Sequence, residues 1–358
     1  MSNTVTWVIE PIDTWFFRQG SPFDLGQNVL TGDVIFPPHM STLQGAIRTA
    51  IAREQGWHNG HDDLWPEILG TPDDLGAMSL EGVFLQKNHQ LLFPVPRHLV
   101  QYGEAIISLT PGDPVESDLG LRALPRLKSG APQEGKVSSL DESYISSEGL
   151  VQSLQGKLPP PETILSPDTL WHQEIRTGLG VNDQTQVAEP GLLYQATHVR
   201  LKKDVSLIVS VKGIPWTWQK SVRAFPLGGE SRFARATLSE HSISLPPLTV
   251  KPSHDGQVRV IAILLTPGLF EDPQRALRDG PLSEPCLSAV TGRVARRGGW
   301  DLKRRRPRPS DSFIPAGSVW FYLLSPKTWD TLKILHGRHV GMKTEYGFGH
   351  IIFGQWEE

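Results

Sequence analysis

The sequence is poor in cysteine and has no apolar run long enough to cross a membrane. Its 358 residues include one cysteine, Cys286, which excludes an intramolecular disulfide and any zinc site that needs two thiolates. The apolar run VIAILL at 260–265 is too short to span a bilayer, and the start, MSNTVTWVIEP, has no basic flank followed by an apolar signal core. We therefore expect a cytoplasmic protein that does not enter a membrane.

Local signatures of common enzyme classes are also missing. The sequence has no G-x-x-x-x-G-K-[ST], no H-E-x-x-H and no G-x-S-x-G, so P-loop nucleotide hydrolysis, zincin proteolysis and α/β-hydrolase chemistry have no local support. The segment HNGHDD at 58–63 has metal-ligand residue types, but it lies in one loop between glycines, whereas metal phosphohydrolases gather ligands from several helices. We interpret it as an exposed polar loop and predict no metal and no cofactor.

One enzymatic alternative stays open at this point. A metal-independent ribonuclease needs only a general base and a cation, and His39 or His339 together with Lys343 could supply them. The spacing of these residues does not by itself bring them together, so the hypothesis rests on residue type alone.

Turn formers and large aromatic residues are plentiful. The chain has 34 glycines and 30 prolines, which predict many chain reversals, while 11 tryptophans and 13 phenylalanines supply a core. Apolar patterns typical of strands occur at 5–9, 205–213, 258–266 and 317–325. A spacing of 3.6 residues predicts a helix that Ser41 or Thr42 caps and Gly56 ends. Ser325 as a cap, Pro326 in the first turn and Gly337 as a terminator predict another.

Strands and short helices interleave in both halves of the chain. This pattern predicts an α+β fold with two units of the βαββαβ type, divided as residues 1–200 and 201–358. Residues 103–170 are poorer in apolar periodicity and rich in proline, glycine and serine, so we interpret them as an insertion in the first unit.

Positive charge is concentrated in one segment. Residues 293–308, RVARRGGWDLKRRRPR, hold eight arginines and lysines against Asp301, a balance of +7 in a chain of net charge −3, so the remaining residues carry −10. Pro307 and Pro309 discourage a helix and Gly298-Gly299 gives slack, which predicts an extended loop that follows a phosphate chain. The candidates are Arg293, Arg296, Arg297, Lys303, Arg304, Arg305 and Arg306. A solvated loop or an acidic protein partner would also explain the cluster.

The opposite composition occurs at 54–81, where seven aspartates and glutamates occur without any lysine or arginine. Nucleic acid should avoid this surface. It is either a solvated helix and loop or a surface that docks on a basic subunit.

Glycines cluster near the end of the chain. YGFGHIIF at 346–353 partly matches the RNA-recognition strand pattern, but Tyr346 replaces its basic residue and His350 replaces an aromatic residue that would stack a base. Glycine permits positive φ and lets backbone N–H groups approach phosphates, with Arg338 and Lys343 supplying charge. We therefore predict RNA contact at Gly341, Gly347 and Gly349. The alternative is a tight turn packed on the protein itself.

Sequence blocks in order from residue 5 to residue 356 together resemble a known family. They are IDTWFFRQGSPF, FPPHMSTLQGAIRTAI, EIRTGLGV with GLLYQATHVRL, PLGGESRFA, GGWDLKRRRPRPS followed by IPAGSVWFYLL, and EYGFGHIIFGQW. They resemble the third subunit of the type III-B CRISPR Cmr complex, a member of the RAMP superfamily. The resemblance is weakest across 103–170.

This resemblance implies two ferredoxin-like (RRM-like) domains with a Gly-rich loop at 337–349, and a non-catalytic scaffold role in antiviral defence. The chain would hold the 5′ tag of crRNA at the base of the complex, beside the large polymerase-like subunit and the backbone RAMP subunit. Target cleavage would belong to other subunits. The rivals are a RAMP endoribonuclease that processes the crRNA precursor and an adaptor whose basic loop meets an acidic subunit.

Four arginines outside the basic segment complete the predicted RNA-binding set: Arg18, Arg48, Arg176 and Arg232. Arg18 keeps the frame of the opening block, in which Gln19 and Ser21 replace an acidic and a basic residue common in the family. Arg48 would point at RNA or at a core carboxylate. Arg176 and Arg232 lie beside glycines that expose backbone donors, which suits phosphate contact, although structural turns would have the same composition.

Overall fold

The computed structural model divides the chain into two compact units that interleave along the sequence. It describes residues 4–17, 34–117, 120–128, 136–181, 185, 187–239, 243–301, 304 and 306–357. Unit 1 comprises residues 1–83, 168–242 and 297–310, and unit 2 comprises residues 84–167, 243–296 and 311–358. Each unit is therefore assembled from three separate stretches of chain.

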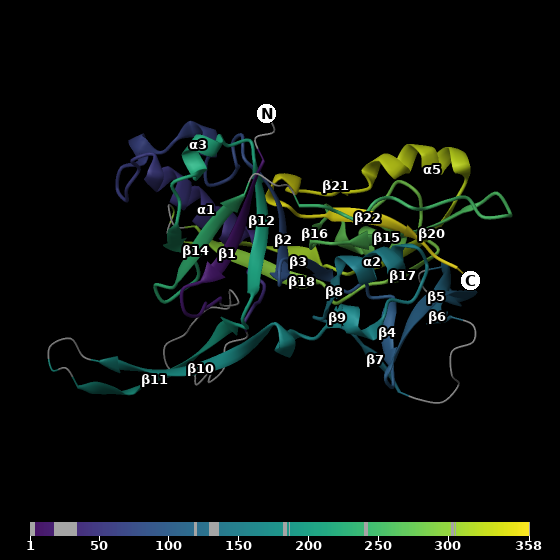
Figure 1. Ribbon diagram of the computed structural model, residues 1–358, viewed down its shortest axis with the longest axis horizontal. Helices are drawn as coiled ribbons and strands as arrows, with labels where there is room; N and C mark the ends of the chain where they lie inside the picture. The colour runs from purple at the N-terminus through teal and green to yellow at the C-terminus, as the bar shows by residue number, and fades with distance from the viewer. Residues whose placement is uncertain are drawn as a thin grey trace. The chain divides into compact units, whose positions relative to one another are not determined.

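Unit 1 is organised around one β-sheet (Figure 1). Its elements are β1 (Val5–Pro11), α1 (Met40–Glu54), η1 (Asp62–Leu64), η2 (Glu67–Leu69), β2 (Ser79–Lys87), β10 (Trp171–Val181), β11 (Ala188–Leu201), β12 (Val205–Lys212), α3 (Trp216–Gln219), β13 (Ala224–Pro226) and β14 (Phe233–Ser239). Within unit 1 its strand order is β13-β14-β1-β12-β2. β1 is antiparallel to both neighbours, with Trp7 opposite Val209 on β12 and opposite Leu238 on β14. Trp7 and Val209 are fully buried, so the middle of this sheet is the core of unit 1.

The first predicted helix is confirmed as α1. Leu43, Ile47 and Ile51 recur at helical spacing and are fully buried, so one face of the helix packs inward. The helix begins at Met40, just before the residues expected to cap it, and Gly56 with a φ of 91° follows its end.

The domain boundary expected after residue 200 lies inside unit 1. Strand β12 was assigned to the second domain, yet it pairs with β1, and the sheet is complete only after β14. Every residue of β12 except Lys212 is buried. Such an apolar strand suits the centre of any sheet, so its composition does not reveal which sheet it joins.

Unit 2 is built from the remaining elements, and the division passes within β2, η4 (Pro167–Thr169), β18 (Ala295–Asp301) and β19 (Arg306–Ile314). Its amino-terminal elements are β3 (Gln90–Pro94), β4 (Leu99–Tyr102), β5 (Ala105–Ser117), β6 (Gly120–Leu127), β7 (Val137–Ser139), β8 (Tyr144–Ser146), α2 (Ser147–Leu154), η3 (Pro161–Thr163) and β9 (Ile164–Leu165). Its carboxyl-terminal elements are β15 (Val258–Leu264), β16 (Gly268–Leu269), α4 (Pro273–Asp279), β17 (Ser288–Val290), β20 (Val319–Leu324), α5 (Pro326–Leu332), η5 (Lys333–Leu335), β21 (Arg338–His339), η6 (Thr344–Tyr346) and β22 (His350–Gln355). The main sheet has the order β17-β20-β15-β22-β21.

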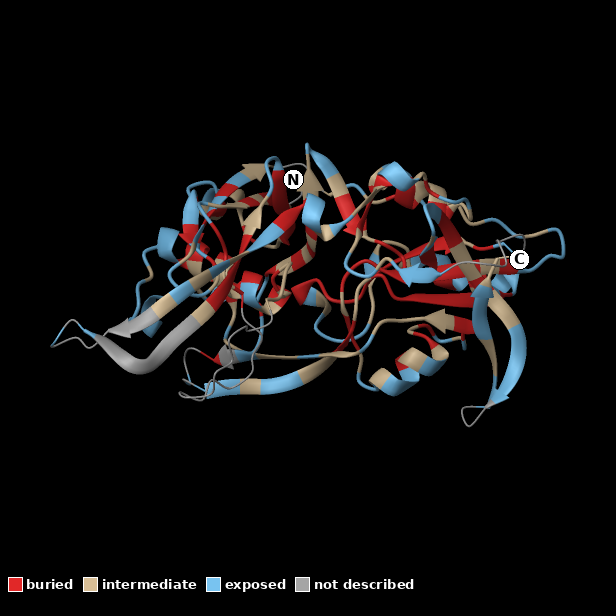
Figure 2. Ribbon diagram, turned by 90° about the horizontal axis from the view of Figure 1, so that it is seen from below, coloured by how far each residue is buried: buried red, intermediate tan, exposed pale blue. Residues whose placement is uncertain are grey.

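The central strand β15 is buried on both faces. Ile261 and Ile263 belong to one apolar cluster, whereas Val260, Ala262 and Leu264 belong to another. Because side chains alternate along a strand, these clusters lie on opposite faces of the sheet. This double burial explains why the strand is a continuous apolar run, and Figure 2 shows buried residues concentrated along such strands.

Residues 103–170 were expected to be an insertion in the first domain. Up to Pro167 they belong to unit 2, where Ile106, Ile145 and Leu150 join the same cluster as Ile261. The apolar residues of this stretch are few, but they lie on short strands and on α2, whose amino terminus Ser146 caps. Because apolar periodicity in this stretch is low, the sequence did not indicate that its residues contribute to the core of unit 2.

The same succession of elements occurs in both units. In unit 1 it is β1, α1, β2, β12, α3 and β14, with the sheet order β14-β1-β12-β2. In unit 2 it is β15, α4, β17, β20, α5 and β22, with the sheet order β22-β15-β20-β17. The predicted α+β class is confirmed. Among the described residues, no helix has the length and apolar character needed to cross a membrane.

Candidate nucleic-acid interface

The two-stranded ribbon of β10 and β11 carries part of the predicted RNA-binding set. Glu174 lies directly opposite His198 in the antiparallel register, and Arg176 lies opposite Ala196. Because side chains alternate between faces, Glu174, Arg176, His198 and Arg200 share one face of the ribbon. The ribbon therefore presents two arginines and a carboxylate together.

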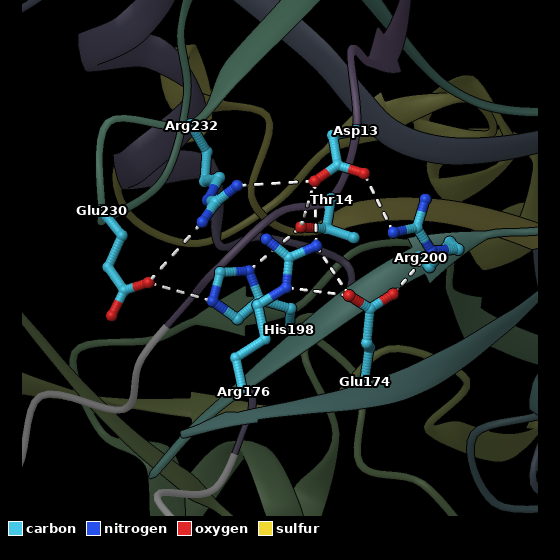
Figure 3. Close-up of polar contacts among 8 residues, drawn as sticks. All are labelled: Asp13, Thr14, Glu174, Arg176, His198, Arg200, Glu230 and Arg232. Atoms are coloured by element: carbon cyan, nitrogen blue, oxygen red, sulfur yellow. Dashed lines mark hydrogen bonds and ion pairs between the residues drawn. The ribbon is translucent and has the colours of Figure 1, made fainter. Parts of the chain in front are cut away.

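Asp13 reaches this face from the loop that follows β1. Trp15 and Val199 exchange two backbone hydrogen bonds, of 2.9 Å from the Trp15 N–H and 2.7 Å from the Val199 N–H, which holds the loop against β11. Arg232 approaches the same carboxylate from the loop between β13 and β14 (Figure 3). Three segments distant in sequence thus meet around Asp13.

Two carboxylates hold three guanidinium groups in this cluster. Asp13 accepts hydrogen bonds of 2.9 Å from Arg176 Nη2 and 2.9 Å from Arg200 Nη2, and Arg232 Nη1 lies 3.5 Å from it. Glu174 accepts bonds of 2.8 and 2.6 Å from Arg176 and one of 2.6 Å from Arg200. The arginine side chains keep between 24% and 36% of their surface exposed, so solvent reaches their outer edges.

These contacts shift the ionisation of both carboxylates. Hydrogen bonds from Arg200 and Arg176 lower the pKa of Glu174 to about 2. The hydrogen bond from Arg176 is the main cause that lowers the pKa of Asp13. Since the carboxylates raise the pKa of Arg176 and Arg200 in turn, the whole cluster is charged at neutral pH.

His198 shares this face of the ribbon and has no exposed side-chain surface. Its Nδ1 is 3.0 Å from the Thr14 hydroxyl, its Nε2 is 3.0 Å from a Glu230 carboxylate oxygen, and the Phe16 ring stacks on it at 5.3 Å. Burial lowers the pKa of His198, so the neutral ring accepts from Thr14 and donates to Glu230. Hydroxyl, imidazole and carboxylate follow the order of a nucleophilic triad, but Thr14 is fully buried, so its hydroxyl is not exposed to solvent.

The structure brings Arg176 and Arg232 together, as the sequence did not show. It also adds Arg200, which we did not predict because no glycine lies beside it. The sequence contained a sign of this arrangement: Glu174 and Arg176, and His198 and Arg200, are each two residues apart, which places these polar side chains on one face of each strand.

The basic segment 293–308 is mostly β-structure, not the expected loop. Strands β18 and β19 cover much of it. Pro307 and Pro309 are compatible with a strand because backbone N–H groups two residues apart point to the same edge, which leaves the other edge free to pair. The prediction of an extended backbone is confirmed, but the prediction of a loop is wrong for the part that β18 and β19 cover.

Members of the basic segment differ in exposure. Arg293, Arg296 and Arg306 are exposed, whereas Arg297 is half-buried and desolvation lowers its pKa. Within the described part of the chain, the side chains of Arg293 and Arg306 form no ion pair or hydrogen bond. Three predicted residues lie outside the described residues: Arg18, Lys303 and Arg305.

Arg304 links the basic segment to the acidic segment 54–81 within unit 1. Its guanidinium donates to Asp73 at 3.1 and 2.9 Å and to Asp301 at 3.1 Å. The hydrogen bond from Arg304 lowers the pKa of Asp73, which is therefore ionised at neutral pH. Part of the acidic segment thus binds cations of the same chain, an arrangement that we did not predict.

The glycines near the carboxyl terminus make room for protein backbone. Gly349 has a φ of 70°, and a Cβ there would lie 1.9 Å from the carbonyl oxygen of Val340. Gly341 has a φ of 93°, and a Cβ there would lie 2.3 Å from the carbonyl oxygen of Leu269. Gly347, with a φ of 87°, follows η6. The tight-turn alternative therefore explains the missing side chains at Gly341 and Gly349.

In the same region, the predicted charged residues are at the surface, whereas the aromatic residues are buried. Arg338 is exposed on β21, and Lys343 Nζ lies 2.6 Å from an Asp311 carboxylate oxygen. Phe348 and Phe353, which matched the RNA-recognition pattern, are 2% and 0% exposed. Their rings therefore pack in the core of unit 2, where a base cannot stack on them.

Arg48 is directed into unit 1. It is 5% exposed and donates to Gln44 Oε1 at 3.1 Å and to the Thr71 carbonyl oxygen at 2.7 Å. Its guanidinium also lies 5.6 Å from the centre of the Trp65 ring. These contacts tie α1 to the loop at 70–76, so this arginine already has a structural role.

The candidate ribonuclease residues are divided between the units. His39 is in unit 1, with Nδ1 2.8 Å from the Ser41 hydroxyl, whereas His339 and Lys343 are in unit 2, where His339 stacks on His350 at 4.3 Å. The segment 58–63 is exposed. Across the described residues, no three histidine, cysteine or acidic side chains are grouped to hold a metal ion.

A comparison with models of protein families identifies one family for this chain. The family model described as CRISPR-associated protein (Cas_Cmr3) matches residues 7–356. A chain in the cryo-EM structure of the Type III-B Cmr-beta bound to cognate target RNA and AMPPnP, state 1, has a TM-score of 0.55 at 14% identity, covering 92% of this chain and 88% of that one. A chain in the structure bound to cognate target RNA has a TM-score of 0.51 at 17% identity, covering 92% and 89%. No curated protein matches the sequence. At these identities the structural likeness concerns the fold.

Proposed function

Because this chain belongs to the Cas_Cmr3 family of CRISPR-associated proteins, we propose that it is a non-catalytic, RNA-binding scaffold subunit of a type III-B CRISPR effector complex. In this role it holds the 5′ tag of crRNA at the base of the complex in antiviral defence. It bridges the large polymerase-like subunit to the backbone RAMP subunit. The family match across nearly the whole chain supports the proposal, as does a fold shared with chains of Type III-B Cmr-beta structures.

Both units are, in this proposal, ferredoxin-like domains of the RRM-like kind. The repeated strand and helix succession and the matching sheet orders support it. RRM sheets bind RNA by stacking bases on exposed aromatic rings. The rings of Phe348, just before β22, and of Phe353, on β22, are buried and do not permit such stacking, so RNA contact here relies on charged side chains and backbone groups.

The observation that carries the RNA-binding role is the positive charge of residues 293–308. The segment has a balance of +7, while the rest of the chain carries −10. Arg306 is exposed there and has no ion-pair partner among the described residues. A polyanion that avoids the acidic remainder of the surface is attracted to this segment, because each neutralised phosphate releases counterions.

The test compares two exposed arginines of unit 1. Arg306→Gln should weaken binding of labelled crRNA tag in fluorescence anisotropy, and the slope of log affinity against log salt should become shallower by about 0.7, the value for one phosphate contact. Arg235→Gln, which removes an exposed charge from β14, should leave the slope unchanged. Equal slopes for wild type and Arg306→Gln would refute the assignment.

Two further experiments address the rivals. Tag RNA in the assembled complex should crosslink to residues 293–350, and an absence of crosslinks would favour the protein-binding adaptor. Incubation of the chain with labelled repeat RNA in EDTA should give binding without cutting. Specific cutting that His39→Ala or His339→Ala abolishes would overturn the scaffold role.

A further inference from the structure

The acidic segment of unit 1 contacts its basic residues with the geometry of an arginine–phosphate pair. Arg304 Nη1 lies 3.1 Å from Asp73 Oδ1, and Nη2 lies 2.9 Å from Oδ2. Two parallel N–H···O bonds of this kind are also how a guanidinium binds phosphate. Beside them, Arg308 Nη2 donates to the Pro72 carbonyl oxygen at 2.9 Å. Residues 72 and 73 thus occupy donors that phosphate oxygens would use.

Two carboxylates contact Arg304, and they differ in burial. Asp301 accepts from the Arg304 backbone N–H at 2.9 Å and from its guanidinium at 3.1 Å, and its side chain is 4% exposed. The Asp73 side chain is 63% exposed. Asp301 therefore fixes the position of Arg304, whereas Asp73 covers its solvent-facing edge and can be displaced.

The turn that presents Asp73 is held by contacts of its own. The Asp74 carboxylate accepts hydrogen bonds from the Thr71 hydroxyl and, at 2.8 Å, from the Gly76 N–H. Arg48 donates to the Thr71 carbonyl oxygen at 2.7 Å, which anchors the turn to α1. These contacts hold the turn itself, whereas the Asp73 carboxylate takes part in none of them, so its side chain can leave Arg304 without breaking them.

We propose that Arg304 and Arg308 form a binding site for a backbone phosphate of RNA, and that Asp73 is an internal competitor for this site. The proposal rests on the RNA-binding role proposed above. Exposed ion pairs are weak, so a phosphate replaces the Asp73 carboxylate while Asp301 keeps Arg304 in place. The competitor lowers the affinity for any isolated phosphate. RNA strands that also contact Arg306 are therefore bound in preference to polyanions that are too short to contact it.

The test measures binding of a labelled single-stranded RNA to the full chain by fluorescence anisotropy. At about 0.1 M salt, Asp73→Asn should bind roughly two- to five-fold tighter than wild type, the range that one exposed ion pair supplies. The gain should shrink at about 1 M salt, where charges are screened within a few ångströms. Asp63→Asn is the matched control, because it removes one exposed negative charge from the same segment without a contact to Arg304.

A double-mutant cycle locates the effect. In the background of Arg304→Gln, Asp73→Asn should give no gain in affinity, because the displaced contact no longer exists. If Asp73→Asn binds RNA no more tightly than wild type, or if Asp63→Asn gives an equal gain, Asp73 is not a competitor for the site. RNA binding by the wild type would in that case still support the proposed function. If the wild type binds no RNA, the proposed function fails together with this inference.

Discussion

Replacing Gly349 by alanine tests why glycines are clustered near the carboxyl terminus. Gly349 has a φ of 70°, its N–H donates to the Pro267 carbonyl oxygen at 2.9 Å, and its carbonyl oxygen accepts from the Val340 N–H at 2.9 Å. The backbone is therefore fixed on both sides of the residue. A methyl group added here meets a carbonyl oxygen that cannot move without disturbing these bonds.

The expected loss of stability has two parts. An alanine at positive φ costs about 1–2 kcal/mol, and forcing an extra carbon into a packed site costs about 1–3 kcal/mol. Gly349→Ala should therefore lower the free energy of unfolding by about 2–5 kcal/mol. Gly256→Ala is the matched control in the same unit, since its φ is 76° but no atom lies within 4 Å of the added Cβ. It should cost only the first part, about 1–2 kcal/mol.

The assay is urea unfolding followed by tryptophan fluorescence, with RNA affinity measured on the same samples. Both variants belong to unit 2, so their midpoints report on the same part of the molecule. The midpoint of Gly349→Ala should fall clearly below that of Gly256→Ala. Equal midpoints, together with a selective loss of RNA affinity in Gly349→Ala, would show that RNA and not protein backbone makes the close approach.

Two further predictions concern ionisable groups. Burial lowers the pKa of His98 from about 6.5 to about 3, so the fold favours the neutral ring; its stability contribution is intact above pH 6.5 and is lost as pH falls toward 3. Between pH 7 and pH 5 the urea midpoint of wild type should report a loss of about 2 kcal/mol that His98→Leu lacks, and equal pH dependence would contradict this. Asp13→Asn should reduce the stability of unit 1 by about 1 kcal/mol, because the carboxylate is 47% exposed and partly screened. The loss should diminish at high salt, and a salt-independent loss would show that Asp13 acts through packing instead.

Patterns within one element were predictable from the sequence, whereas pairings between distant elements were not. Apolar residues on both sides of Lys87-Asn88-His89, in the segment 82–96, are a pattern typical of a hairpin, and the structure places Asn88 and His89 at positive φ between β2 and β3. Local chemistry fixes such a turn. The partner of β12 depends instead on contacts across more than a hundred residues, so a division of the chain at one point missed the interleaved units.

Prediction of the candidate site was limited in the same way. Arg176 and Arg232 were selected because glycines lie beside them, yet Asp13 is what unites them, through a loop bridged to Val199. The acidic segment was considered as a surface for a separate basic subunit. Its contact with Arg304 joins residues far apart in sequence, which charge counting within a window cannot reveal.

In the free protein, carboxylates hold both the arginines around Asp13 and Arg304, and this affects how far their charge contributes to the salt dependence of the proposed RNA binding. If all eight cations of residues 293–308 met phosphates, the salt slope would be about −6, at roughly 0.7 for each contact. Arg304 instead exchanges one anion, Asp73, for another, so its contact releases fewer counterions than that of Arg306. The salt dependence of binding should therefore count the arginines that face solvent in the free protein, not those present in the sequence. In this proposal, Arg304 contributes to the affinity for RNA but little to the salt slope, whereas Arg306 contributes to both.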